Sequence, residues 1–322
     1  GRLQRGRHRP PEDQDPGASR REALTPTNMD WIPLLRFPIE WGALALFVVG
    51  CLYWERAGFT GLGVEGTVAA AMIGFIAGYD ATASYAAASG VAAASAALFA
   101  LATGSILLSL RTDPAIGSFA ASLVSACGLG LLTRTGSHAL LTEQPPPGLV
   151  RGTIFDGTYA EDLIGSPWLV AAPLLVALAS WIYWRTPFGL RLRAFGETPS
   201  LRVPGTSAAR TRLIGVAVGS LFVVPGAGLL LRQSGSSPPV ALGLLALACA
   251  VAGRWAFAPS LLLAAGVALL RTARPYAGAS GPVAVTLEIA PFLLALLYLV
   301  FLSRRSLRIS ATRQSRLDPD TL

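Results

Sequence analysis

The chain contains no lysine, so all 26 of its basic residues are arginine. Charge of either sign is scarce, because charged residues fill only 14% of the 322 positions while apolar residues fill 52%. Soluble domains carry about 25% charged residues, so this composition places the chain among polytopic membrane proteins. The arginines gather in an N-terminal, a central and a C-terminal segment, as expected where positive charge marks the cytosolic side. The high pI therefore implies no nucleic-acid partner.

Cysteine and histidine are also rare. The three cysteines lie in apolar runs without a CxxC pattern, and the two histidines lie far apart, so we expect neither a disulfide framework nor a metal site. The sequence has no P-loop and no pair of carboxylates in one cytosolic loop of the kind that metal-dependent membrane enzymes need. We expect no cofactor and no catalytic residue, and a separate subunit must supply any ATP hydrolysis.

Long apolar runs dominate what is present. They predict an all-α, polytopic integral membrane protein with about eight to ten transmembrane or partly spanning helices, since one span takes about 20 residues. Runs shorter than that are expected to tilt or to pair as half-helices. The Ala/Ser/Gly-rich run predicts close helix packing in lipid, and Pro225–Gly226 predicts a kink or break. The expected spans are 32–53, 68–79, 81–110, 114–132, 168–184, 213–231, 239–251, 260–270 and 283–302.

Polar segments divide the chain into three parts. Residues 1–28 are charged and rich in Pro and Gly, which predicts a disordered leader. Met29 opens the first apolar region, so we expect it to be the natural start or the leader to be extra upstream sequence. Residues 29–303 are expected to form the transmembrane domain. Residues 304–322 form a basic tail that we expect in the cytosol.

The most basic internal segment, residues 185–212, separates two apolar runs. It holds six arginines, three prolines and three glycines against one acid, Glu197. Arginine resists translocation, so we expect a cytosolic loop here. The loop 133–167 is near-neutral to acidic and is expected outside.

Three acids lie in or beside the expected spans: Glu65, Asp80 and Glu288. An acid at the bilayer centre costs roughly 2.5–3.5 kcal/mol on insertion scales. These residues therefore either mark a polar solute path or proton relay, or cap helix ends near the headgroups. No acid–acid or His–acid pair recurs along the spans, which argues against a proton-coupled transporter.

Four segments together resemble one family. The first is WERAGFTGLGVEGTVAAAM, with Glu55, Arg56, Gly58, Gly63, Glu65 and Gly66 in place. The second and most specific is RTPFGLRLRAFGETP, which begins at Arg185 and ends at Pro199. The third is the GRW turn at 253–255, and the fourth is the closing run LEIAPFLLALLYLVFLSRR. In this order the segments resemble permease subunits of bacterial ABC importers of the simple-sugar and nucleoside branch, which are related to branched-chain amino acid permeases.

The resemblance implies a multi-pass protein of the bacterial plasma membrane that moves a nucleoside or simple sugar. Its implied partners are cytosolic ABC ATPase subunits, a homologous second permease and an external solute-binding lipoprotein. The implied ATPase-coupling residues are Phe188, Gly189, Leu192, Arg193, Gly196, Glu197 and Pro199. Glu55, Arg56, Glu65, Asp80 and Glu288 are candidates for structural or pathway roles.

One departure from the family pattern follows Pro199. The small-residue run expected there is replaced by SLRVPGTSAAR, in which Pro204 disfavours a helix. Three readings stay open: an ABC permease, an ion-coupled secondary transporter or polytopic membrane enzyme, and a non-transporting scaffold.

Overall fold

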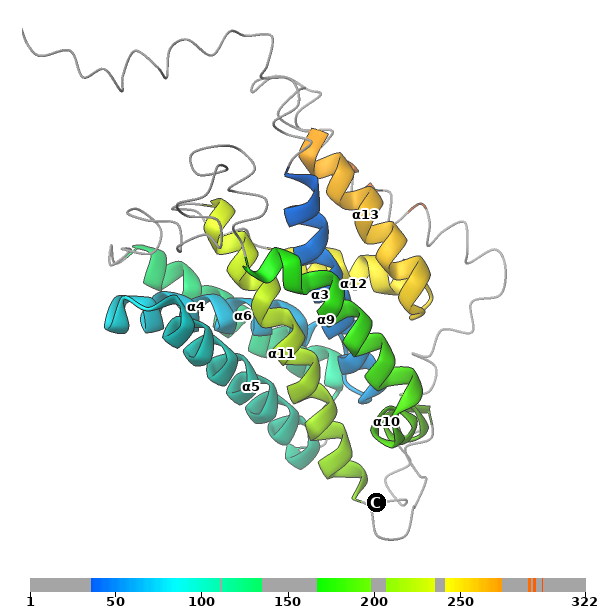
Figure 1. Cartoon of the computed structure of the whole chain (residues 1–322). Coiled ribbons are helices and arrows are strands. Elements are labelled where there is room, and N and C mark those ends of the chain that lie inside the picture. Colours follow the sequence, from blue (N-terminus) through cyan, green and yellow to red (C-terminus); the bar gives the residue numbers. More distant parts are fainter. Residues whose placement is uncertain are drawn as a thin grey trace, which may run out of the picture.

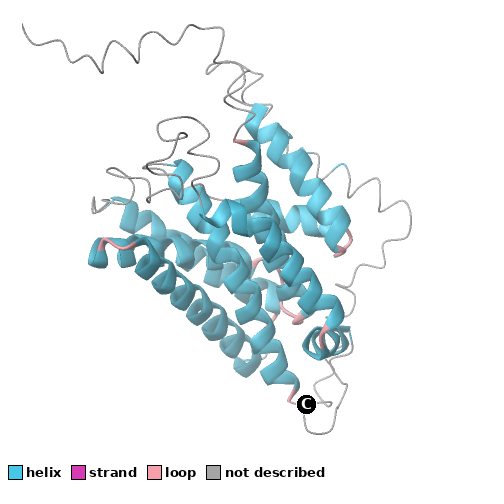
Figure 2. Ribbon diagram, viewed as in Figure 1, coloured by secondary structure: helices cyan, strands magenta, loops and turns pink. Residues whose placement is uncertain are grey.

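The computed structural model describes residues 36–110, 112–134, 167–197, 207–234 and 241–273, with a few positions between 289 and 297. This part of the chain is helical and contains no strand (Figures 1 and 2). The expected all-α, polytopic architecture is confirmed. The helices are α3 (Phe37–Arg56), α4 (Gly63–Thr82), α5 (Tyr85–Leu110), α6 (Pro114–Arg134), α9 (Pro167–Arg185), α10 (Pro187–Glu197), α11 (Ala208–Ser234), α12 (Leu242–Ala252) and α13 (Phe257–Ala273).

Length and composition separate two kinds of helix. Within the described ranges, α3, α5, α6, α9 and α11 are long and apolar enough to cross a membrane. By contrast, α12 and α13 have 11 and 17 residues, fewer than the roughly 20 that one span needs. The expectation of shorter, partly spanning helices is therefore confirmed. The leader 1–28, the tail 304–322 and most of the expected span 283–302 lie outside the described residues.

Burial places α3 and α11 at the centre of the bundle. The apolar windows of these two helices are 78% and 72% buried, whereas those of α6 and α9 are only 17% buried. The outward faces carry large apolar side chains such as Leu98, Ile116 and Leu174. Apolar residues on both the inner and outer faces of a helix are typical of membrane spans, and α5, α6 and α9 carry the exposed apolar surface of the described bundle.

Glycines allow α3 and α11 to approach closely. A Cβ added at Gly50 would lie 2.6 Å from a Val223 methyl, and one at Gly219 would lie 2.7 Å from the Tyr53 Cβ. At the same crossing, the Trp54 indole N–H donates to the Ser220 hydroxyl at 3.3 Å. Small residues at such a contact let backbones pack tightly where lipid provides no hydrophobic drive.

The Ala-rich helix α5 packs on α4 through a stripe of small residues. Its fully buried residues recur every fourth position, which places them on one helix face: Ala88, Ala92, Ala96 and Ala100. The facing residues on α4 are Gly74 and Gly78, where an added Cβ would lie 2.7 and 2.8 Å from the α5 backbone. The close packing expected of this segment is confirmed.

Of the kink or break expected at Pro225, the break does not occur, because α11 continues through this residue to Ser234. Proline removes one backbone donor and its ring crowds the carbonyl four residues earlier, at a cost of about 3 kcal/mol. The rest of the turn is held by packing on α3, where a Cβ at Gly226 would lie 2.7 Å from the Phe47 ring. Burial between neighbouring helices therefore outweighs the helix-breaking tendency of a single proline.

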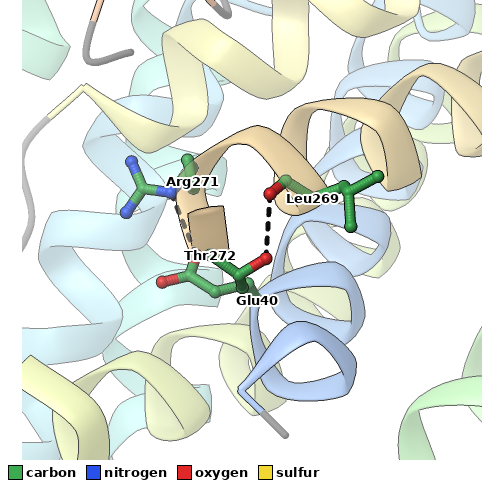
Figure 3. Close-up of polar contacts among 4 residues, drawn as sticks. All are labelled: Glu40, Leu269, Arg271 and Thr272. Atoms are coloured by element: carbon green, nitrogen blue, oxygen red, sulfur yellow. Dashed lines mark hydrogen bonds and ion pairs between the residues drawn. The ribbon is translucent and has the colours of Figure 1, made fainter. Parts of the chain in front are cut away.

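An ion pair joins the beginning of α3 to the end of α13. Arg271 Nε lies 3.0 Å from a Glu40 carboxylate oxygen, and the Glu40 side chain is only 11% exposed (Figure 3). One residue further on, the Thr272 hydroxyl donates to the Leu269 carbonyl at 2.9 Å (Figure 3). This pair fastens the two helices at the end of α3 that lies away from Arg56.

Candidate functional site

The first half of segment 185–212 is a helix rather than the loop that the sequence predicts. Thr186 begins it: its hydroxyl oxygen accepts the Gly189 N–H at 3.2 Å while donating to the Ile182 carbonyl at 2.6 Å. Pro187 occupies the first helical position, where its missing N–H costs nothing. A Cβ at Gly189 would collide with the Ile182 and Tyr183 carbonyls. The Thr-Pro-x-Gly sequence thus builds a tight corner between α9 and α10 (Figure 1).

One face of α10 packs on the membrane helices. Leu192 and Phe195 are almost fully buried, and Phe188 packs on the same core. Leu192 reaches α11, where a Cβ at Gly215 would collide with it. A Cβ at Gly196 would collide with the Arg56 carbonyl at the end of α3. The family residues of α10 therefore hold this short helix against the ends of α3, α9 and α11.

Arg193 adds a cation–π contact to this docking. Its guanidinium carbon lies 4.6 Å from the Trp184 ring centroid and 5.2 Å from that of Tyr183. The other face of α10 points outward, with Leu190 62% exposed and Arg191 also exposed. The short helix α10 is thus packed against the bundle on one face and exposed on the other.

The turn between α3 and α4 is clamped by an arginine from the first part of α11. Arg212 donates from Nε to the Ala57 carbonyl at 2.6 Å and from Nη2 to the Gly58 carbonyl at 2.9 Å. Its guanidinium also lies 4.9 Å from the Phe59 ring centroid. Gly58 has φ +78° and would place a Cβ 2.6 Å from Arg212 Nη2. Only glycine suits both the left-handed backbone and the arginine.

Glu55 acts within the same turn. Its carboxylate accepts the Gly61 N–H at 3.2 Å. The Thr60 hydroxyl donates to the Pro114 carbonyl at 3.1 Å and so connects the turn to the start of α6. Glu55 therefore joins the end of α3 to the residues just before α4.

Glu65 caps another helix. One carboxylate oxygen accepts the Ala241 N–H at 2.8 Å, and the other accepts those of Gly243 and Leu244 at 2.6 and 3.2 Å. These donors form the first turn of α12, where backbone N–H groups have no partner within the helix and the helix dipole favours a negative charge. The next residue, Gly66, donates its N–H to Ser122 of α6 at 3.1 Å.

The GRW sequence forms the turn between α12 and α13. Arg254 and Trp255 both have left-handed backbone angles, with φ +56° and +59°. The Arg254 N–H donates to the Val251 carbonyl at 2.9 Å, and the Trp255 N–H donates to that of Ala250 at 2.9 Å. These bonds close the last turn of α12, so the motif reverses the chain between two half-helices.

Among the remaining predicted residues, Asp80 lies apart from this group, whereas Arg56 and Glu197 end two of the helices that meet in it. Asp80 lies exposed in the last turn of α4, at the opposite end of that helix from Glu65. Arg56 ends α3 with its guanidinium carbon 6.0 Å from the Tyr183 ring centroid. Glu197 is the last residue of α10, whereas Pro199 and Glu288 lie outside the described residues. In the described ranges, no three His, Cys, Asp or Glu side chains gather as a metal site would require.

Sequence reasoning missed Arg212, Glu40 and Arg271 as contact-forming residues. Each lies near the end of an apolar helix, where a charged residue is readily taken for a topology marker. No local spacing around Arg212 reveals its partner Ala57, which lies 155 positions away in the chain.

These helices and turns define the class of the protein as a multi-pass membrane protein. The residues of its characteristic sequence segments form turns and contacts between helices rather than a reaction centre. The chain is 27% identical over 232 residues to the guanosine ABC transporter permease protein NupQ of Bacillus subtilis (strain 168), covering 66% of this chain and 72% of that protein. No family model matches the chain. No solved structure matches it either.

The similarity to NupQ confirms the resemblance to ABC-transporter permeases of the nucleoside and sugar type. With five long apolar helices in the described part of the chain, it supports a multi-pass protein of the bacterial plasma membrane. NupQ is named as a transporter permease, and the general architecture of this chain fits such a role.

Proposed function

We propose that this chain is the permease subunit of an ABC importer that carries a nucleoside or a simple sugar into the cell. The observation that carries the proposal is α10: a short helix held on the ends of three membrane helices, with its other face exposed. The relative NupQ is named as a permease for guanosine, which supports the same solute class here.

In this mechanism the chain transmits force and performs no chemistry. A cytosolic ATPase docks on the exposed face of α10 and pushes on it when ATP-driven closure occurs. Gly196 passes the movement to Arg56 of α3, and Leu192 passes it to Gly215 of α11. Because packed helices move as rigid bodies, a small displacement of α10 can shift both central helices.

The α3–α4 turn extends this path into the half-helices. Arg212 ties the turn to α11, and Glu65 ties the first turn of α4 to the first turn of α12. Movement of α3 and α11 therefore reaches α12 through these hydrogen bonds and the stretch of chain between Gly58 and Glu65. Half-helices near the middle of a membrane commonly line the solute path in transporters.

The partners follow from this arrangement. Two ATPases bind at the α10 end, a homologous permease completes the pore, and an external lipoprotein delivers the solute at the other end. The Glu40–Arg271 pair then lies on the external side. The leader and the basic tail (residues 304–322) are assigned to no partner, and the tail is proposed to be cytosolic.

The competing class, an ion-coupled secondary transporter, requires a relay of acids. Glu65 and Asp80 are 15 positions apart on one helix, which corresponds to roughly 22 Å along its axis. Glu65 is engaged in capping α12. These observations favour the ABC permease over a proton relay.

The test replaces Glu197, the last residue of α10, by Ala or Arg in the complete complex reconstituted in liposomes. Glu197→Arg is expected to uncouple ATP hydrolysis from guanosine uptake while membrane insertion stays intact. Arg202→Glu, a charge reversal in the same segment, is expected to do less. Wild-type uptake in Glu197→Arg would contradict the coupling role, and absence of ATP-driven uptake by the wild-type complex would contradict the importer itself.

A further inference from the structure

Three aromatic side chains from three helices meet at one glycine of α11. A Cβ added at Gly228 would lie 3.0 Å from the Phe75 ring, 3.0 Å from the Tyr85 hydroxyl and 3.2 Å from Trp168 Cδ1. Phe75 belongs to α4, Tyr85 begins α5, and Trp168 lies in the first turn of α9. A residue larger than glycine at 228 would push the three rings apart.

The rings differ in burial and in orientation. Phe75 and Tyr85 stack with their centroids 5.8 Å apart and an interplanar angle of 24°. Phe75 is fully buried, whereas Tyr85 and Trp168 are half-buried. Phe75 therefore forms the floor of the cluster, and the other two rings form its rim.

Trp168 differs from the other tryptophans of α9 in the burial of its side chain. Trp181 and Trp184 are 57% and 52% exposed, as expected for anchors at a membrane interface. Trp168 instead turns its indole N–H inward, where it is buried without an acceptor among the residues that the structure describes. Buried N–H groups nearly always have a partner, so this donor calls for one.

The cluster lies at the end of the bundle away from α10. Phe75 is 12 positions beyond the start of α4 at Gly63, or roughly 18 Å along the helix, and Tyr85 and Trp168 begin helices that run back toward that corner. In the proposed importer this is the side on which the solute arrives. The inference that follows rests on that proposed function.

We propose that Phe75, Tyr85 and Trp168 form a recognition site for the base of a nucleoside. A planar base moves the Tyr85 ring outward and stacks between it and the buried Phe75 ring, and one of its ring nitrogens or its carbonyl oxygen accepts the Trp168 N–H. Sites for small ligands are commonly lined by aromatic rings with a few placed polar groups. A free sugar has no aromatic face to stack, so the cluster favours a nucleoside over a sugar.

Entry of the base requires the rim to move. Tyr85 is the first residue of α5. The turn before it contains Ala83, which has a left-handed φ of 49°. The ring therefore stands on a helix end rather than within a continuous helix. Its displacement leaves the buried ring of Phe75 in place as the stacking surface.

The test measures binding of radiolabelled guanosine to the permease–ATPase complex in nanodiscs, without the lipoprotein, by equilibrium dialysis. Trp168→Phe keeps the ring and removes the N–H, so we expect the Kd to rise about five- to tenfold, as for loss of one hydrogen bond. Tyr85→Leu is expected to weaken binding as well. Trp181→Phe, the matched control on the same helix, is expected to leave the Kd unchanged, and excess ribose is expected not to compete.

An unchanged Kd in Trp168→Phe, competition by ribose equal to that by guanosine, or absence of guanosine binding to the wild-type complex would each overturn this inference. Failure of the proposed function has a different signature, because it is read as the absence of ATP-driven uptake by the wild-type complex. A complex that transports guanosine but binds it equally well with Phe at position 168 contradicts only the recognition site.

Discussion

The carboxylate of Glu65 accepts the backbone N–H of Gly243 at 2.6 Å and so joins the first turn of α4 to the first turn of α12. The two residues are separated by 178 positions in the chain. A carboxylate that accepts three N–H groups satisfies donors that a helix cannot satisfy by itself. This contact gives a physical reason for the acid in the GVEG sequence.

Replacing Glu65 by Ala is expected to lower the stability of the folded protein by about 2 kcal/mol or more, because hydrogen bonds to a charged group contribute about 1.5–3 kcal/mol. Glu65→Gln keeps one acceptor oxygen, so its stability is expected to lie between that of the wild type and that of Glu65→Ala. The measurement is the thermal unfolding midpoint in detergent. Asp80→Ala, at the exposed end of the same helix, serves as the control, and a Glu65→Ala midpoint equal to that control would contradict the capping role.

Gly58→Ala is expected to destabilise the α3–α4 turn. A side chain there meets both a left-handed backbone, which costs about 1–3 kcal/mol, and the Arg212 guanidinium 2.6 Å from its Cβ. Gly90 of α5 has no atom within 4 Å of an added Cβ, so Gly90→Ala is expected to be neutral or to stabilise by up to about 1 kcal/mol. Opposite effects of the two variants on the unfolding midpoint are the expected result. Equal effects would show that Arg212 does not restrict the turn.

Arg193→Ala is expected to loosen α10 from α9. The loss corresponds to a cation–π contact of about 0.5–2 kcal/mol with Trp184 and Tyr183. Hydrogen–deuterium exchange of the α10 amides should rise in this variant. Arg191→Ala removes a charge from the exposed face of the same helix and should leave that exchange unchanged. If the exchange of the α10 amides is unchanged in Arg193→Ala, the cation–π contact does not hold this helix, and the packing of Leu192 and Phe195 alone holds it.

Most spans could be predicted from the sequence because they are long and apolar. The expected spans 114–132 and 168–184 match α6 and α9 to within two residues, since an arginine or proline stands at each end. The helix α10 was expected as loop because its buried residues alternate with arginines in a segment rich in Pro and Gly. Its start signal, Thr186 followed by Pro187, was nevertheless present in the sequence.

The candidate site was only partly predictable. The positions of Leu192, Arg193 and Gly196 follow from the family resemblance, but their contacts do not. The partners of Glu65, Arg212 and Trp168 lie far along the chain, and spacing within one segment carries no information about them. The continuity of α11 through Pro225 likewise depends on packing against α3, which no local rule describes.

The central claim, that α10 is the docking surface for the ATPase, is tested most directly by photo-crosslinking. A photoreactive amino acid is placed at the exposed position 191 of α10 and, in a separate variant, at the exposed position 181 of α9, in membranes that contain the complete complex. An adduct with the ATPase subunit from position 191 and none from position 181 is the predicted result. Absence of an ATPase adduct at 191, or equal adducts at both positions, would contradict the account.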